Sequence, residues 1–226
     1  SKDIAENISL ASTPLSITID TTAPDAPTLV TSSSITSDSK PLITGYAEAD
    51  STITLLNGNF INLVSKTNSN GVFSITPSLS DGDYTFAAMA TDAAGNISTI
   101  SSSISIIIDT TTPLIFGPSG KWVPLDEISI AEGNTNVFSY SADEDVSWSI
   151  DQYGNFYGEG EGQTDSKKFS IDQSGSLLFN SAPDFEKPTD SDANNTYLVS
   201  VIATDKAGNS SSQSLTVTIT DDEDQD

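Results

Sequence analysis

Carboxylates are almost the only side chains of this chain that can do chemistry. The sequence has 32 Asp plus Glu against 8 basic residues, no Cys and no His, and a formal net charge of −24. Oxygen ligands suit Ca²⁺ and Mg²⁺, whereas zinc, copper and thiol chemistry would find no Cys or His. So large a charge opposes compaction unless cations lie among the carboxylates, and it argues against nucleic acid and anionic membranes as partners. A merely solvated acidic surface is the alternative.

The acids recur at fixed places because the chain repeats one unit. The stretch from Thr91 to Asn96, with the strand after it, returns from Asp205 to Asn209 at an offset of 113 residues, and a shorter copy ends at Asp20. A repeat at this spacing indicates similar modules strung end to end. The sequence therefore predicts a terminal strand of a preceding module over residues 1–20, a first domain over 21–110 and a second over 111–226.

Alternating apolar and polar residues, separated by turn signals, predict seven short strands in each domain. The strand from Tyr84 to Ala90 shares its pattern with the strand from Tyr197 to Ala203, again at the same offset. No stretch keeps a helical period, so we expect an all-β fold of two tandem antiparallel β-sandwiches with almost no helix. The other predicted strands are Leu29–Ile35, Pro41–Ala47, Ser51–Leu56, Phe60–Val64, Val72–Ile75, Ser103–Asp109, Glu127–Ala131, Asn136–Ser141, Val146–Ile150, Lys168–Ile171, Ser176–Phe179 and Ser214–Thr220.

Three acidic clusters are expected to meet at the entrance of each sandwich. In a seven-strand sandwich the entry connector, the turn after the second strand and the turn after the sixth strand lie at one end. Scattered surface acids would not select the same three turns twice, and carboxylates brought together repel unless a cation lies between them. Ca²⁺ suits such flexible mixed sites better than Mg²⁺. The predicted ligands are Asp20, Glu48, Asp50 and Asp92 in the first domain and Asp109, Asp143, Asp145 and Asp205 in the second.

Further acids lie toward the opposite end of the second domain. Glu132, Asp184 and Glu186, with Asp222 in the acidic exit, are predicted to form half of a metal site that a following module completes, although the exit run alone would be a solvated tail. Asp190 and Asp192 begin an alternation of oxygen ligands like that of an EF-hand loop, but the Gly at position six and the Glu at position twelve are missing. An Asx-rich turn is the alternative there.

Two resemblances follow from these motifs. Residues 21–109 resemble the bacterial Ig-like repeats of giant secreted adhesins, through Asp20-Thr-Thr-Ala-Pro, Thr44-Gly-Tyr-Ala-Glu-Ala and Thr91-Asp-Ala-Ala-Gly-Asn. Residues 114–226 are similar to a cadherin-like domain through Ala131-Glu-Gly-Asn, Ala142-Asp-Glu-Asp, Asp184-Phe-Glu, Ala203-Thr-Asp and the terminal acidic run. The resemblance implies a calcium-stiffened extender in an RTX-type, type I secreted adhesin on a bacterial surface, with neighbouring modules as partners.

A Gly-rich loop in the second domain offers a different function. Tyr153, Phe156 and Tyr157 lie in it, and exposed aromatic rings can stack on sugars. The second domain is therefore the alternative place for binding a carbohydrate or protein ligand, although a simple insertion beside a core Trp148 is the plainer interpretation. Paired acids in this loop could suggest a glycosidase, but a flexible Gly loop cannot hold two carboxylates at a fixed separation. We therefore expect no enzyme and a monomer without membrane contact.

Overall fold

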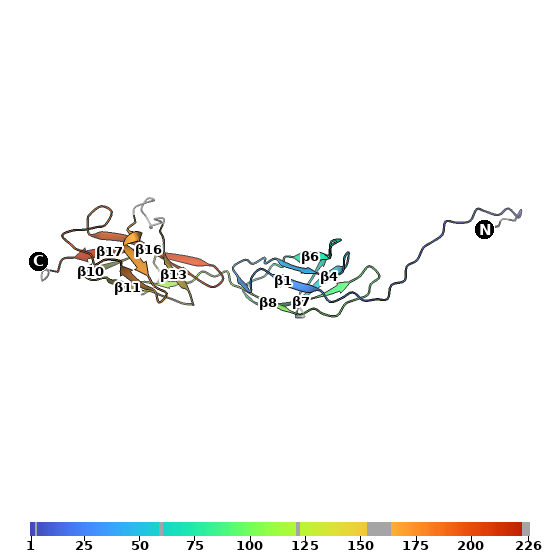
Figure 1. Cartoon of the computed structure of the whole chain (residues 1–226), viewed down its shortest axis with the longest axis horizontal. Helices are drawn as coiled ribbons and strands as arrows, with labels where there is room; N and C mark the ends of the chain where they lie inside the picture. The colour runs from blue at the N-terminus through green and yellow to red at the C-terminus, as the bar shows by residue number, and fades with distance from the viewer. Residues whose placement is uncertain (3, 59–60, 121–122, 153–163, 223–226) are drawn as a thin grey trace. The chain divides into compact units, whose positions relative to one another are not determined.

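The fold is built from strands. The computed structural model describes residues 1–2, 4–58, 61–120, 123–152 and 164–222, and within them the only helical element is the 3₁₀ turn η1 (Ser166–Lys168) (Figure 1). Short alternating runs and frequent Gly, Pro and Asx turns leave no room for a sustained helical period. The prediction of an all-β chain of two sandwiches is confirmed.

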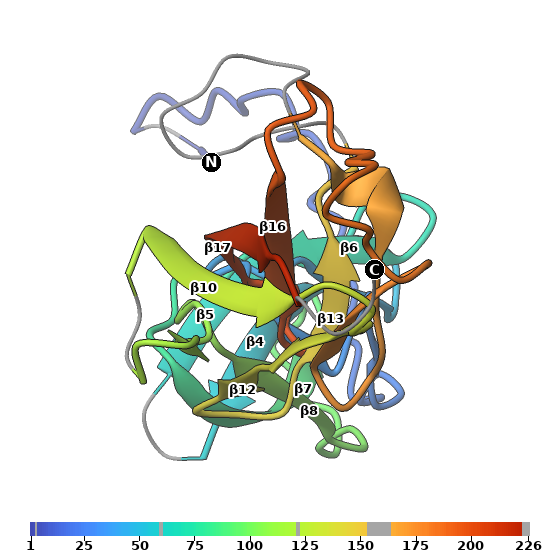
Figure 2. The same cartoon turned by 90° about the vertical axis from the view of Figure 1, so that its left-hand side faces the viewer.

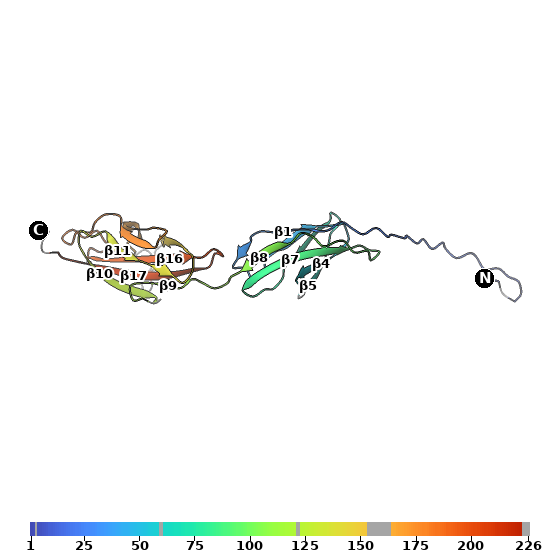
Figure 3. The same cartoon turned by 90° about the horizontal axis from the view of Figure 1, so that it is seen from below.

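The first β-rich part has two sheets. The burial pattern alternates along their strands, as Phe86, Ala88 and Ala90 are buried while their neighbours are partly exposed. β1 belongs to a different layer from β4 and β5 (Figure 3). One sheet has the order β1 (Thr28–Thr31), β3 (Ile43–Tyr46), β6 (Val72–Ile75), and the other β2 (Ile35–Thr36), β8 (Ile104–Ile108), β7 (Gly82–Thr91), β4 (Thr52–Asn57), β5 (Ile61–Lys66).

The second β-rich part has a four-stranded sheet, a three-stranded sheet and a two-stranded pair. The long strands β16 and β17 form its centre, with β17 between β10 and β16 (Figure 2). The four-stranded sheet has the order β10 (Leu125–Ala131), β17 (Ser210–Thr220), β16 (Thr196–Thr204), β13 (Ser147–Ile150). The others are β11 (Asn136–Ser139), β15 (Ser176–Phe179), β14 (Phe169–Ile171), and the pair β12 (Ser141–Ala142) with β9 (Ile115–Phe116).

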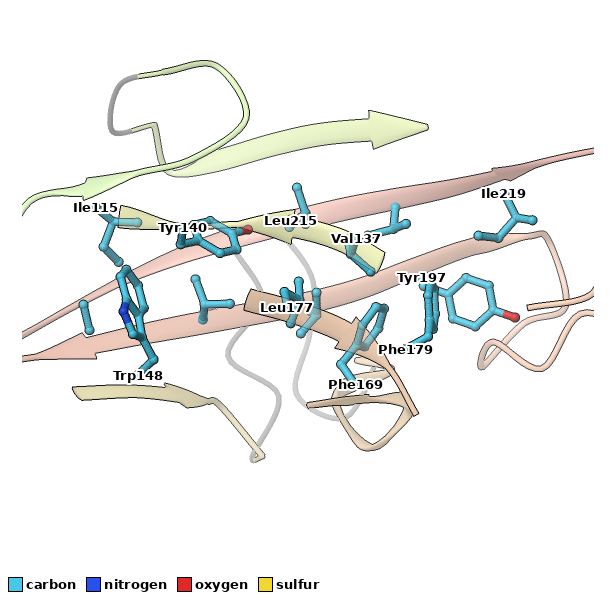
Figure 4. Close-up of a cluster of buried hydrophobic side chains, with 14 residues drawn as sticks. Ile115, Val137, Tyr140, Trp148, Phe169, Leu177, Phe179, Tyr197, Leu215 and Ile219 are labelled. Carbon is cyan, nitrogen blue, oxygen red and sulfur yellow. The ribbon is translucent and has the colours of Figure 1, made fainter. Parts of the chain in front are cut away.

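An aromatic and aliphatic core fills the space between these sheets (Figure 4). Phe179 from β15 meets Phe169 with ring centroids 4.4 Å apart and Tyr197 with centroids 5.0 Å apart. Trp148 is buried beside Tyr140, so it is a core residue. Because alternate side chains of β16 and β17 point inward, the turn between these strands is held at a fixed place at the end of the sheet.

Two pairings differ from a purely antiparallel arrangement. β2 pairs with β8, and β10 with β17, in parallel. In each case the first strand of a sandwich is divided into two parts. The earlier part, β1 or β9, pairs in one sheet, and the later part, β2 or β10, pairs in parallel with the last strand of another sheet. The predicted strand from Leu29 to Ile35 is thus divided between β1 and β2, and β9 was not predicted because it has only two residues.

The contacts along the chain divide it into two compact units. One comprises Ser1–Thr31, Leu42–Ile75 and Thr85–Ile104, and the other Ser32–Pro41, Thr76–Tyr84 and Ser105–Asp226. The predicted boundaries after residues 20 and 110 therefore stay a prediction. Apart from a bridge between Lys2 and Ile8, the described residues before Asp20 form no strand, and Ile17 and Ile19 are exposed.

Candidate metal centres

The turn after β16 is fixed by an Asp–Asn pair. The Asp205 carboxylate accepts hydrogen bonds from the backbone N–H groups of Gly208 at 2.7 Å and Asn209 at 2.9 Å, and from the Asn209 side-chain amide at 2.8 Å. The same amide donates to the backbone carbonyl of Asp109 at 2.8 Å. Asn209 therefore ties the residue that follows β8 to the turn after β16.

The turn after β7 repeats this arrangement. Asn96 donates its backbone N–H to Asp92 at 2.8 Å and its side-chain amide to the same carboxylate at 2.7 Å. That amide also reaches the backbone carbonyl of Asp20 at 3.2 Å. The repeat found in the sequence is therefore a repeat of geometry, in which an Asn joins an acidic turn to the connector at the start of the domain.

Asp109, Asp205 and Glu144 form the upper carboxylate group. One oxygen from each lies within 4.8 Å of the others. Asp205 is buried, Asp109 is half-buried and Glu144, in the turn after β12, is exposed. All three belong to the same compact unit.

Crowding of negative charge perturbs this group. Partial desolvation raises the pKa of Glu144, and the charges of Asp205, Asp109, Asp143 and Asp145 raise it further. Burial opposes ionisation of Asp205, but the hydrogen bonds from Asn209, Gly208 and the backbone around them outweigh it and lower its pKa. The hydrogen bonds of Asp205 thus favour its ionised form, whereas the negative charge around Glu144 opposes ionisation there, and a bound cation would relieve that repulsion.

The other two predicted members of this set, Asp143 and Asp145, contact other partners. The Asp143 carboxylate accepts the backbone N–H of Leu114 at 2.7 Å, so it joins the connector to the turn. Asp145 pairs with Lys206 at 2.8 Å, and the hydrogen bond from Lys206 lowers the pKa of Asp145. The structure therefore brings Asp109 and Asp205 together with Glu144 rather than with the acids on either side of it.

Glu132, Glu186 and Asp221 form the lower carboxylate group, again with one oxygen from each within 4.8 Å of the others. Glu132 is held in place because its two oxygens accept the backbone N–H groups of Phe185 at 3.0 Å and Asp222 at 3.1 Å. Asp222 thus contributes its backbone N–H, while its neighbour Asp221, in the same predicted acidic exit, supplies the carboxylate. Asp184 lies outside the group and pairs with Lys187 at 3.4 Å.

The predicted ligands of the first domain are not gathered in this way. Within the described residues no group of three carboxylates includes Asp20, Glu48, Asp50 or Asp92. The backbone carbonyl of Glu48 accepts hydrogen bonds from Ser51 and Thr67, each at 2.7 Å. Asp50 has a positive φ of 60°, a conformation typical of a tight turn. These acids shape a turn, and their binding of a metal stays a prediction.

The stretch around Asp190 and Asp192 has Asx hydrogen bonding. Asp190 accepts the backbone N–H of Asn194 at 2.7 Å, and Asp192 accepts the Asn194 side-chain amide at 2.8 Å. This is the pattern of the Asx-rich turn. The aromatic candidates Tyr153, Phe156 and Tyr157 lie outside the described residues.

Both carboxylate groups suit a hard cation. Their candidate ligands are carboxylate oxygens only, and these oxygens lie close together. Calcium accepts mono- and bidentate carboxylates and backbone carbonyls in a flexible shell of six to eight oxygens. Three carboxylates supply only part of such a shell, and the remainder would come from carbonyl groups and water.

Comparison with known proteins gives a family match for one stretch of the chain. Residues 23–110 match the family of bacterial Ig-like domains. The last matched strand is therefore β8, and Asp109 of the upper carboxylate group lies at the end of the matched stretch. The resemblance of this stretch to bacterial Ig-like repeats is confirmed. No curated protein matches the chain.

Several solved structures are similar to the chain. One is a calcium-stabilised adhesin that helps an Antarctic bacterium to bind ice, with 19% identity, a TM-score of 0.46 and coverage of 98% of this chain and 55% of that one. Another is Drosophila N-cadherin EC1–4, with 19% identity, a TM-score of 0.35 and coverage of 87% of this chain and 51% of that one. Protocadherin gamma B2 domains 3–6 have 17% identity, a TM-score of 0.38 and coverage of 88% and 52%. The chain spans about half the length of these structures. No helix among its described residues is long and apolar enough to cross a membrane.

Proposed function

We propose that this chain is a non-catalytic, calcium-stiffened extender segment of a large bacterial surface adhesin, of the RTX type and secreted by a type I system. The bacterial Ig-like family of residues 23–110 supports the bacterial and modular part of this proposal. The lack of Cys in a chain with 32 acidic residues supports metal rather than disulfides as the stabilising cross-link.

The observation that carries the proposal is the upper carboxylate group. Three acids from distant parts of the sequence have oxygens within 4.8 Å of one another. Even with screening by solvent, each like-charged pair at this range costs on the order of 1 kcal/mol. Bound Ca²⁺ would supply the compensating positive charge. Asp109, Glu144 and Asp205 would then hold the end of β8 against the turns after β12 and β16.

The neighbouring residues position these ligands. Asn209 fixes the Asp205 carboxylate and the Asp109 backbone in one network of hydrogen bonds. Asp143 holds the connector through the Leu114 N–H. These bonds limit the movement of the connector before any ion is bound, so that binding needs little further ordering. Stiff connections between successive domains would extend a binding domain away from the cell.

Thermal unfolding with calcium and with a chelator tests the proposal. We expect a higher Tm at millimolar Ca²⁺, because a ligand that binds only the folded state adds about 2.7 kcal/mol at one hundred times its Kd. Glu144→Gln removes the charge of one ligand and breaks no hydrogen bond that the structure describes. This variant should therefore lose part of the rise in Tm that calcium gives. Asp83→Asn, an equal charge change at an exposed site, should retain it. An unchanged wild-type Tm in calcium would contradict the proposal.

The partners follow from the extender function. We propose that the lower carboxylate group contacts a further module of the same chain, and that the segment is extracellular and monomeric. A ligand on a host or substratum surface would be bound elsewhere in the adhesin. Static light scattering of the chain in calcium should therefore give the monomer mass, and a defined dimer would argue against this role.

A further inference from the structure

A buried acidic loop in the second β-rich part is not explained by the two carboxylate groups. It consists of residues 189–198, which follow β15 and run into the start of β16, together with Asp165, and we name it the Asp190 loop. Asp190 is 8% exposed and Asp165 only 5%. Acidic residues are almost never buried to this degree unless a partner compensates their charge.

Asp165 fastens both ends of this loop. Its two carboxylate oxygens accept the backbone N–H of Ser191 at 2.8 Å and of Leu198 at 2.9 Å. Its own backbone N–H donates to the Leu198 carbonyl at 2.7 Å. The Asp165 carboxylate therefore lies at the inner side of the loop, where sequence spacing alone would not have placed it.

Asp190 is the less satisfied of the two acids. One of its oxygens accepts the Asn194 N–H, but Oδ1 is buried and has no hydrogen-bond partner. The side-chain oxygen of Asn195, in the same loop, is also buried without a partner. An unpaired buried carboxylate oxygen is costly, so two such oxygens in one short loop indicate a missing positive or donor group.

Among the described residues, no lysine forms an ion pair with Asp165 or Asp190. The ion pairs among the described residues involve Glu6, Asp184 and Asp145, and neither Asp165 nor Asp190. The carboxylates also act on each other, since burial raises the pKa of Asp165 and the charges of Asp190 and Asp192 raise it further. Asp165 and Asp190 are thus two buried acids that repel each other, and no positively charged side chain among the described residues offsets this repulsion.

We propose that the Asp190 loop is a third binding site, for one hard cation such as Ca²⁺, held by Asp190 and Asp165 with the Asn195 side-chain oxygen as a neutral ligand. Its ligand set differs from the EF-hand-like alternation in the sequence, because Asp192 and Asn194 are engaged with each other. The site lies within one β-rich part, so it stabilises the loop before β16 and does not depend on the proposed function of the upper carboxylate group.

Counting bound ions tests the site. After equilibrium dialysis against Ca²⁺, the full chain with Asp190→Asn should bind one ion fewer than the wild type, as measured by atomic absorption. Asp83→Asn makes the same change at an exposed position near the start of β7 and should bind as many ions as the wild type. If Asp190→Asn keeps the full number of ions and has a higher Tm with and without chelator, the proposal is wrong and the residue is only a buried charge.

A second measurement uses the wild-type protein, so its result does not depend on whether the variant folds. In amide NMR spectra, addition of Ca²⁺ should shift the Ser191, Asn194 and Leu198 signals. Ser174 and Ser176 are the matched control, because their N–H groups bond the exposed Asp172 carboxylate in the same way. If the loop signals remain fixed during the titration, an ordered water or a proton satisfies Asp190. Gly208 and Asn209 report separately on the upper carboxylate group, so the failure of one site is distinguishable from failure of the other.

Discussion

Among single residues, Gln213 has the least satisfied environment in the core. Its side chain is fully buried, and neither its amide nitrogen nor its oxygen has a hydrogen-bond partner. Gly117 lies so close that a Cβ there would be 2.6 Å from both amide atoms. A buried amide without partners lowers stability by about 1–3 kcal/mol.

We therefore expect Gln213→Met, which keeps the shape and removes the amide, to raise the free energy of unfolding by about 1–3 kcal/mol. Urea denaturation measures this change. Gln173→Met, at an exposed turn, should change stability by less than about 0.5 kcal/mol. If Gln213→Met destabilises the protein, the amide has a partner such as an ordered water.

Residue types in the sequence indicated which loops carry the carboxylates, but not every side chain that takes part. Asp143, Glu144 and Asp145 are consecutive, and only the path of the backbone decides which of them faces Asp109 and Asp205. The same holds for Asp221 and Asp222. Asn96 and Asn209 could have been found from sequence, because each occupies the same place in the repeated unit.

Glu144 also gives a pH prediction. Its raised pKa means that its stabilising contribution is fully present below the unfolded value near 4.5 and is lost as pH rises through the folded pKa. In the presence of a chelator, the Tm of the wild type should therefore rise more than the Tm of Glu144→Gln when pH falls from about 7 to about 5. Differential scanning calorimetry of both proteins tests this, and parallel curves would contradict it. Calcium should reverse the trend, because it binds the ionised carboxylate.

At the scale of elements, β16 and β17 hold the site. Leu215 is fully buried and lies in the strand that pairs with both β10 and β16. Leu215→Ala should lower the free energy of unfolding by about 2–5 kcal/mol, through lost burial and the cavity left behind. Ile107→Ala, at a 42% exposed position of β8, is the comparison and should cost far less. Equal losses in chemical denaturation would show that burial does not decide the effect.

Most strands were predictable because alternation of apolar and polar residues follows directly from the period of a β-strand. The strong alternation in β7, β8, β16 and β17 marks the last hairpin of each sandwich. The division of the first strand into β1 and β2 was not predictable, since Ser32 to Ser34 carry no pattern. Parallel pairing depends on which strands become neighbours in three dimensions, and no local pattern contains that information.

At the scale of the whole molecule, charge is the dominant property. The net charge is −24, so the acidic side chains repel one another and the folded chain should be most stable where cations are abundant. Monovalent salt screens this general repulsion, whereas calcium at specific sites should act at far lower concentration. Titration with NaCl and with CaCl₂ at matched ionic strength separates the two. If both salts raise Tm equally, screening alone explains the effect.

Diffraction from crystals grown in calcium is the most direct test of the central claim, that acids from separate turns meet to hold an ion. We expect an anomalous peak between the carboxylates of Asp109, Glu144 and Asp205, within about 2.3–2.6 Å of their oxygens. A well-ordered structure at millimolar calcium, with these side chains turned apart and no peak between them, would contradict it.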